Sequence, residues 1–260
     1  MTAARTLFGV RIDPLTMDRT VERCLATVRA GERLEIGVVN AAKLVGMRRD
    51  PRLAEAVGGC DLVLADGQSV VWASRLLRRP LPERVAGIDL FLRLLAAAEP
   101  EGIPVYFLGA REEVLARMLD EVRRRFPRLT VAGHRNGYFT DAEQPAVADA
   151  VRDSGAAMLF LGMTSPKKEI FTASYGKQTG VQVVHGVGGS FDVLAGVTRR
   201  APRSWQRLGL EWLYRLLQEP RRLARRYVTT NAAFVLMTVR ELVRPTPAPG
   251  LGAGPANRSH

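Results

Sequence analysis

Hydrophobic residues along the chain follow two spacings, one typical of buried strands and one typical of helices. Short, continuous apolar runs recur in the segments LEIGVVN, DLVLAD, IPVYFLG, RLTVAG, AAMLFLG and VQVVHG. Between two of these runs, residues 111–126 carry apolar side chains at helical spacing, at Val114, Leu115, Met118, Leu119 and Val122. Strands that alternate with helices predict an α/β fold, with a mostly parallel sheet and helices on both faces.

Polar and glycine residues follow several of the predicted strands. Asn40, Asp66, Gly109, Gly162 and Gly186 fall at strand ends or directly after them. In open α/β sheets, ligands bind outside the carboxyl ends of the strands. We therefore expect the functional site at this edge of the sheet.

Asp66 and Gly67 join a predicted strand to a predicted helix. An Asp-Gly pair is a common turn, and an aspartate often caps the helix that follows it. A carboxylate at a strand end could instead accept a proton from an attacking hydroxyl, as a general base. The residues alone leave both interpretations open.

A glycine-rich stretch, HGVGGSFDVLAG at 185–196, follows the last predicted strand. Gly186, Gly188 and Gly189 would let the backbone approach a phosphate or ribose closely, and Asp192 could accept hydrogen bonds from a ribose or base. Phe191 occupies the position where a dinucleotide fingerprint needs glycine, so this is not a dehydrogenase motif. The alternative is a tight turn in which Asp192 caps a helix.

Two further segments carry candidate ligand-binding residues. In GMTSPKKEIF (162–171), a helix is expected to begin near Pro166, where its N-terminus and the charges of Lys167 and Lys168 would attract an anion. The alternative is a capped surface helix with solvated lysines. In NGYF (136–139), Tyr138 could stack on a nucleobase or belong to the core.

The character of the chain changes at about residue 199. Residues 199–228 hold nine arginines and two glutamates, a net charge of +7 out of +12 for the 260 residues. Trp205, Leu208, Trp212 and Leu216 are predicted to share one helical stripe, and Pro220 to break or redirect the chain. We divide the chain into a core (1–198), a basic helical appendage (199–244) and a Pro/Gly-rich, disordered tail (245–260).

The positive charge favours an anionic partner. The basic segment could be a solvated helix, a nucleic-acid-binding element or a membrane-binding element, and its Trp/Leu stripe beside arginines best fits an anionic membrane surface. Cys24 and Cys60 lack metal-ligand spacing, and no signal peptide or spanning segment is recognised. We expect a cytoplasmic protein, peripheral on the inner face of the cell membrane, without a metal or other cofactor.

Taken together, the motifs resemble those of the WecG/TagA/CpsF family of bacterial glycosyltransferases over residues 8–228. The resemblance rests on Asn40 and on ADG (65–67), ERVAGIDL (83–90), FLGA (107–110), NGYF, SPKKE (165–169), GVGGSFDVLAGVTRRAP (186–202) and GLEWLYRLLQEPRRLARRY (209–227). Several ordered motifs are far more specific than any one of them.

The resemblance implies a Rossmann-like, metal-independent, inverting transferase. It would move a hexose or N-acetylhexosamine from a UDP-sugar to a polyprenyl-diphosphate-linked sugar in surface polysaccharide synthesis. It implies that Asp66 is the catalytic base and that Asn40 holds a sugar. Tyr138, Asp192 and the glycines of the loop would lie by the nucleotide, and Arg215, Arg222 and Arg225 would reach the acceptor diphosphate and the membrane.

Two positions depart from the family pattern. Lys168 stands where many members have glutamine, and Val38 stands where some have threonine. Both adjoin the expected sugar pocket, so the identity of the donor sugar does not carry over from the family. The alternative function is nucleic-acid binding. Under the transferase interpretation, we expect that no nucleic acid is bound. Whether the protein forms a homo-oligomer is left open.

Overall fold

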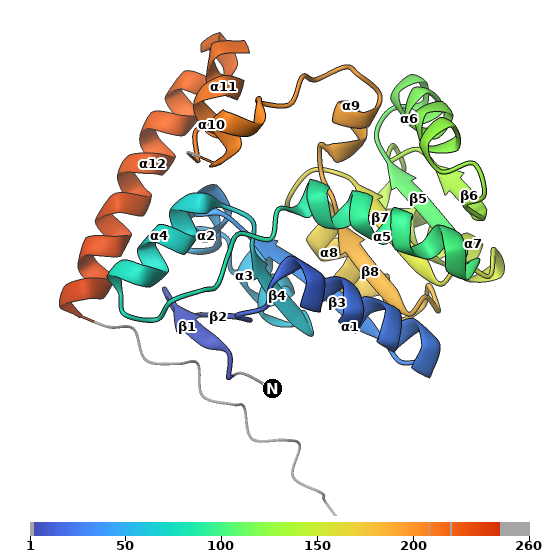
Figure 1. Ribbon diagram of the computed structural model, residues 1–260, viewed down its shortest axis with the longest axis horizontal. Helices are drawn as coiled ribbons and strands as arrows, with labels where there is room; N and C mark the ends of the chain where they lie inside the picture. Colours follow the sequence, from blue (N-terminus) through green and yellow to red (C-terminus); the bar gives the residue numbers. More distant parts are fainter. Residues whose placement is uncertain (1–2, 208, 219, 245–260) are drawn as a thin grey trace, which may run out of the picture.

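The computed structural model describes residues 3–207, 209–218 and 220–244, and its centre is one parallel sheet (Figure 1). The six strands lie in the order β4-β3-β8-β7-β5-β6, and every neighbouring pair is parallel. The strands are β3 (Leu34–Val39), β4 (Leu62–Ala65), β5 (Val105–Gly109), β6 (Val131–Arg135), β7 (Met158–Gly162) and β8 (Val183–Gly186). The α/β, Rossmann-like prediction is confirmed.

Helices cover both faces of the sheet, which explains why the central strands are continuous apolar runs rather than alternating ones. On one face, the strands form a single core with four helices: α1 (Met17–Ala30), α5 (Gly87–Glu101), α6 (Glu112–Arg125) and α9 (Ser190–Leu194). The other face carries two clusters. One involves α2 (Ala41–Met47), α3 (Pro51–Gly58) and α4 (Gln68–Leu76), and the second involves α7 (Gln144–Asp153) and α8 (Lys167–Tyr175).

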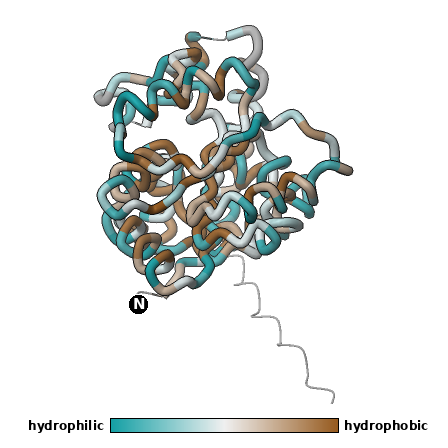
Figure 2. Tube along the Cα trace, turned by 90° about the vertical axis from the view of Figure 1, so that its right-hand side faces the viewer, coloured by the Kyte–Doolittle hydropathy of each residue, from teal (hydrophilic) through white to brown (hydrophobic). Residues whose placement is uncertain are grey.

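Hydrophobic stretches of the chain gather in the interior of the molecule (Figure 2). The core under α5 includes four phenylalanines, Phe91, Phe107, Phe160 and Phe191, whose neighbouring ring centroids lie 4.8–6.1 Å apart. Phe191 therefore belongs to the core. Its ring fills the space beside Gly162, where a Cβ would lie 2.3 Å from the ring.

The direction in which successive strands are added to the sheet reverses between β5 and β7, which are neighbours in the sheet. After β5 the chain turns through α6 to β6 on one side, and after β7 it turns through α8 to β8 on the other. Such a switch point opens a crevice outside the carboxyl ends of the two strands. Gly109 lies here with a φ of 144°, and a Cβ on it would be 2.4 Å from the carbonyl carbon of Gly162.

An antiparallel hairpin, β1 (Arg5–Leu7) and β2 (Val10–Ile12), precedes the sheet. The sequence analysis did not predict it, because each strand has only three residues. Leu7, Phe8 and Ile12 are buried in the same cluster as α2 and α3.

The C-terminal segment forms three helices, α10 (Arg203–Arg207), α11 (Glu211–Gln218) and α12 (Pro220–Val243). The expected single stripe from Trp205 to Leu216 is wrong, because the chain turns at Gly209, whose φ is 64°. Pro220 does redirect the chain, since it begins α12. Leu208 and the tail 245–260 lie outside the described residues.

One face of helix α12 packs against the part of the molecule that contains the sheet. Phe234 and Met237 are buried in the cluster that contains the N-terminal hairpin, and Phe234 lies 5.4 Å from Phe8 between ring centroids. Among the residues that the structure describes, no helix is long and apolar enough to cross a membrane.

Candidate functional site

Asp66 lies at the carboxyl end of β4, beside Asn40 at the end of β3. The strands pair in parallel up to Val39 and Ala65, and the Asp66 N–H donates to the Val39 carbonyl at 2.9 Å. Asn40 lies so near that a Cβ on Gly67 would be 3.1 Å from its Cβ. The parallel register therefore brings these two predicted site residues together.

The carboxylate of Asp66 is held by a helix distant in sequence. Its Oδ1 accepts a hydrogen bond at 3.1 Å from the N–H of Gly87, the first residue of α5. The interpretation that Asp66 caps the following helix is wrong: Gly67 is the N-cap of α4, and that cap has no side-chain hydrogen bond. Asp66 is partly exposed, and among the described residues its Oδ2 has no protein partner.

Asn40 is the N-cap of α2. Its Oδ1 accepts a hydrogen bond from the backbone N–H of Lys43 at 3.0 Å, which satisfies one of the free donors of that helix end. The side-chain amide nitrogen is not used in this cap, so it stays available as a donor.

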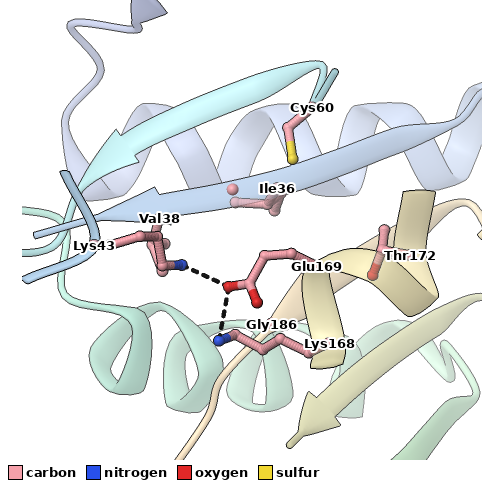
Figure 3. Close-up of a pocket in the computed structure, with 9 residues that line it drawn as sticks. Ile36, Val38, Lys43, Cys60, Lys168, Glu169, Thr172 and Gly186 are labelled. Atoms are coloured by element: carbon pink, nitrogen blue, oxygen red, sulfur yellow. Dashed lines mark hydrogen bonds and ion pairs between the residues drawn. The ribbon is translucent and has the colours of Figure 1, made fainter. Parts of the chain in front are cut away.

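A buried charged cluster lies beside this edge, between β3, β8 and α8 (Figure 3). Oε1 of Glu169 contacts the ammonium groups of Lys43 at 2.7 Å and Lys168 at 2.8 Å, and it accepts a hydrogen bond from Ser165 at 2.8 Å. Lys168 also donates to Ser165 at 2.6 Å. The cluster borders a small pocket whose other lining residues are Ile36, Gly37, Val38, Cys60, Thr172 and Gly186.

The surroundings shift the titration of this cluster. Burial alone would raise the pKa of Glu169, but the ammonium groups of Lys43 and Lys168 outweigh it and lower this pKa to about 2. Burial, and then the charge of Lys43, lower the pKa of Lys168. Two ammonium groups thus share one ionised carboxylate, and Asp66 is a further negative charge that acts on Lys168.

The interpretation that Lys167 and Lys168 are solvated is wrong. Lys168 is 7% exposed, and its stem crosses Gly186 so closely that a Cβ there would lie 3.0 Å from Cδ and Cε of the lysine. Lys167 donates to the carbonyls of Gly137 and Phe139, each at 3.0 Å. Both ammonium groups therefore fix neighbouring segments.

The glycine-rich loop leads from β8 into the short helix α9. Gly188 adopts a φ of 53°, and a Cβ on Gly189 would lie 3.8 Å from Oδ2 of Asp192 and 3.9 Å from Nη2 of Arg215. Arg215 comes from α11 and is exposed. The fold therefore brings together three residues that the sequence analysis had linked to the nucleotide and the diphosphate.

Tyr138 projects from the loop after β6 with 69% of its surface exposed, so it does not belong to the core. Its hydroxyl accepts a hydrogen bond from Nε of Arg111 at 3.2 Å. Arg111 precedes α6, at the switch point between β5 and β7, and the charge of Asp192 acts on it. An exposed ring beside a guanidinium and a carboxylate at a switch point can receive a nucleobase and ribose.

Four residues join the segment after α9 to the beginning of α5. Arg84 pairs with Glu211 of α11, and Arg200 pairs with Asp89 in the first turn of α5. These residues lie in the motifs ERVAGIDL, TRRAP and GLEW, but the sequence analysis gave them no role. It likewise missed Lys43, Glu169 and His185. Lys43 pairs with Glu169 and His185 contacts Gly87, and in both cases the two residues are far apart in the sequence.

The side chains of Arg222 and Arg225 lie outside the part of the chain that the structure describes, although their backbone belongs to α12. Within the described residues, no group of three or more His, Cys, Asp or Glu side chains is arranged to hold a metal ion.

A comparison with known protein families agrees with the motifs. Residues 5–248 match the model of the glycosyl transferase WecG/TagA/CpsF family, which is nearly the whole chain. The match confirms the resemblance that the sequence motifs predicted.

Proposed function

The chain belongs to the WecG/TagA/CpsF family of glycosyltransferases, which acts in cell-surface polysaccharide synthesis, and we propose that it moves a hexose or N-acetylhexosamine from a UDP-sugar to a polyprenyl-diphosphate-linked sugar. The observation that carries this proposal is the carboxylate of Asp66. It lies at the carboxyl edge of the sheet, with Oδ1 bonded to Gly87 and Oδ2 free of protein partners among the described residues.

Asp66 is the general base in this mechanism. Its carboxylate takes the proton of the acceptor hydroxyl, whose oxygen attacks the anomeric carbon from the face opposite UDP. The new glycosidic bond forms as the bond to the diphosphate oxygen breaks, so one displacement inverts the configuration. UDP leaves with an additional negative charge, and the proton remains on Asp66.

The other candidate residues surround this reaction. The free amide of Asn40 is a donor to a sugar hydroxyl, while the buried ammonium of Lys168 contributes positive charge to the same edge. Tyr138 and Asp192 receive the base and ribose. Fixed N–H groups and cations stabilise a leaving diphosphate best when they are already in place; Gly188, Gly189 and Arg215 are proposed for this task.

The test measures UDP release from a panel of UDP-sugars with short-chain prenyl-diphosphate-linked acceptors, with and without EDTA. General-base catalysis contributes about 10²–10⁴-fold, so Asp66→Asn should lose activity of that order and keep its melting temperature. Activity in EDTA should match that without it. Equal turnover by Asp66→Asn and wild type would remove the proposed base.

We also propose that α12 meets an anionic membrane. Val228, Val235, Val239 and Leu242 fall on one stripe of the helix and are 52–68% exposed, while the opposite face packs on the sheet domain through Phe234 and Met237. An amphipathic helix with clustered arginines near one end binds such a surface through both burial and charge.

A further inference from the structure

His185 is a buried titratable residue to which the proposed mechanism gives no part. It lies in β8 and is completely buried, 6.4 Å from Phe160 between ring centroids. Its Nε2 lies 3.0 Å from the carbonyl oxygen of Gly87. Because a carbonyl only accepts hydrogen bonds, Nε2 must carry the ring proton, which fixes the tautomer.

The ring is held in this one form by its surroundings. Burial lowers the pKa of His185 to about 4, and the charges of Lys168 and Lys43 act in the same direction. The ring is therefore neutral near pH 7 and has a single donor. Nδ1 has no hydrogen-bond partner among the described residues, so the contact with Gly87 is the one polar interaction of the side chain that the structure describes.

Gly87 connects His185 to Asp66. Its carbonyl accepts from His185, and its N–H donates to Oδ1 of Asp66 at 3.1 Å. Gly87 is also the first residue of α5, where a backbone N–H has no acceptor within the helix. Two residues earlier, the N–H of Val85 donates to Ala65 at 2.9 Å, which holds the approach to α5 against the end of β4.

We propose that His185 is a positioning residue for catalysis: by holding the carbonyl of Gly87, it fixes the N–H that orients the carboxylate of Asp66. This inference rests on the proposed role of Asp66 as the base. A displacement of about 1 Å at a reacting group can cost about 10²-fold in rate. His185 touches neither substrate, so its loss should lower kcat and leave KM for the UDP-sugar unchanged.

Two substitutions separate the hydrogen bond from the ring. In His185→Gln, the side-chain amide nitrogen reaches about as far as Nε2 and can donate to Gly87, whereas in His185→Asn it is too short to do so. We expect kcat to fall roughly 10- to 100-fold in His185→Asn and to be largely retained in His185→Gln. Equal losses in the two variants, or a loss expressed only in KM, would overturn the proposal.

A double-mutant cycle tests whether His185 acts through Asp66. In an Asp66→Asn background, His185→Asn should cause no further fall in kcat; a full additional fall would contradict the inference. Failure of the proposed function looks different, because Asp66→Asn alone would then keep wild-type turnover. If His185→Asn keeps normal turnover while Asp66→Asn is inactive, the positioning role of His185 is overturned and the proposed function is not.

If His185→Asn does not fold, the wild-type protein still provides a test. Nitrogen NMR of histidine-labelled protein reports which ring nitrogen carries the proton. The expected signal is a neutral ring protonated at Nε2 near pH 7. A neutral ring protonated at Nδ1 alone would leave Nε2 without a proton to donate to Gly87, and it would refute the proposal.

Discussion

Arg200 holds both carboxylate oxygens of Asp89, each 2.7 Å from a guanidinium nitrogen. Asp89 lies in the first turn of α5, two residues after Gly87, while Arg200 precedes α10. A bidentate pair of this kind fixes orientation as well as distance. The basic C-terminal segment is therefore tied directly to the helix that orients Asp66.

Replacing Arg200 should loosen this connection. The side chains of Arg200 and Asp89 are 24% and 37% exposed, so water screens the pair and we expect Arg200→Ala to cost about 1 kcal/mol. For a chain of this size the melting temperature should fall by about 2–4 °C, and proteolysis between α9 and α11 should accelerate. Arg199→Ala, at the exposed neighbouring position, is the matched control; equal effects would show that the bidentate pair contributes nothing.

Glu169→Gln should be strongly destabilising. The substitution leaves the ammonium groups of Lys43 and Lys168 buried without their shared carboxylate, and an uncompensated buried charge costs about 3–5 kcal/mol. Urea unfolding measures the change in the free energy of unfolding. Lys168→Met should cost less, because Lys43 and Glu169 remain paired. The control is Glu55→Gln on the exposed surface of α3, and an equal midpoint for the two glutamate variants would contradict the prediction.

Stability should fall as the pH is lowered from about 6.5 to about 4. The folded protein lowers the pKa of His185 from 6.5 to about 4, so within this range the unfolded chain binds the proton more readily than the folded one. By linkage, the free energy of unfolding loses about 3 kcal/mol across that range. His185→Gln should lack this component, and the difference between the two pH curves measures it. Parallel curves would contradict the buried, neutral ring.

The exposed stripe of α12 should determine binding to anionic vesicles. Val235→Asp with Val239→Asp should weaken binding at low salt by at least roughly tenfold, since burying one valine is worth about 1.5 kcal/mol. Ala116→Asp with Ala146→Asp adds the same charge to exposed positions on α6 and α7, and it should bind nearly as wild type. Co-sedimentation with liposomes measures the binding. Equal binding by the two double variants would contradict the proposal that this face of α12 meets the membrane.

The sheet could be predicted because burial on both faces gives each central strand a continuous apolar run. The parallel order then places Asn40 and Asp66 side by side without further information. The hydrogen-bond partner of the Asp66 side chain could not be predicted, because Gly87 lies 21 residues away in the sequence. Neighbouring residues suggested a cap for α4, but the carboxylate bonds to α5 instead.

Charged residues were the main source of error. The sequence left open whether Lys168 is solvated or binds an anion, because the buried cluster to which it belongs includes Lys43, which lies 126 positions before Glu169. Arg84 and Arg200 were visible as parts of motifs, but their carboxylate partners are separated from them along the chain. The break at Gly209 was also missed, because the apolar stripe from Trp205 to Leu216 continues across it.

The contact between Phe8 and Phe234 has a consequence for biosynthesis. The hairpin and helices α2 and α3 are synthesised long before α12, yet their apolar cluster is completed by α12. During synthesis this surface stays uncovered while the rest of the sheet forms. Nascent chains that expose apolar surface aggregate readily, so we expect the docking of α12 to be the step at which chaperones matter most.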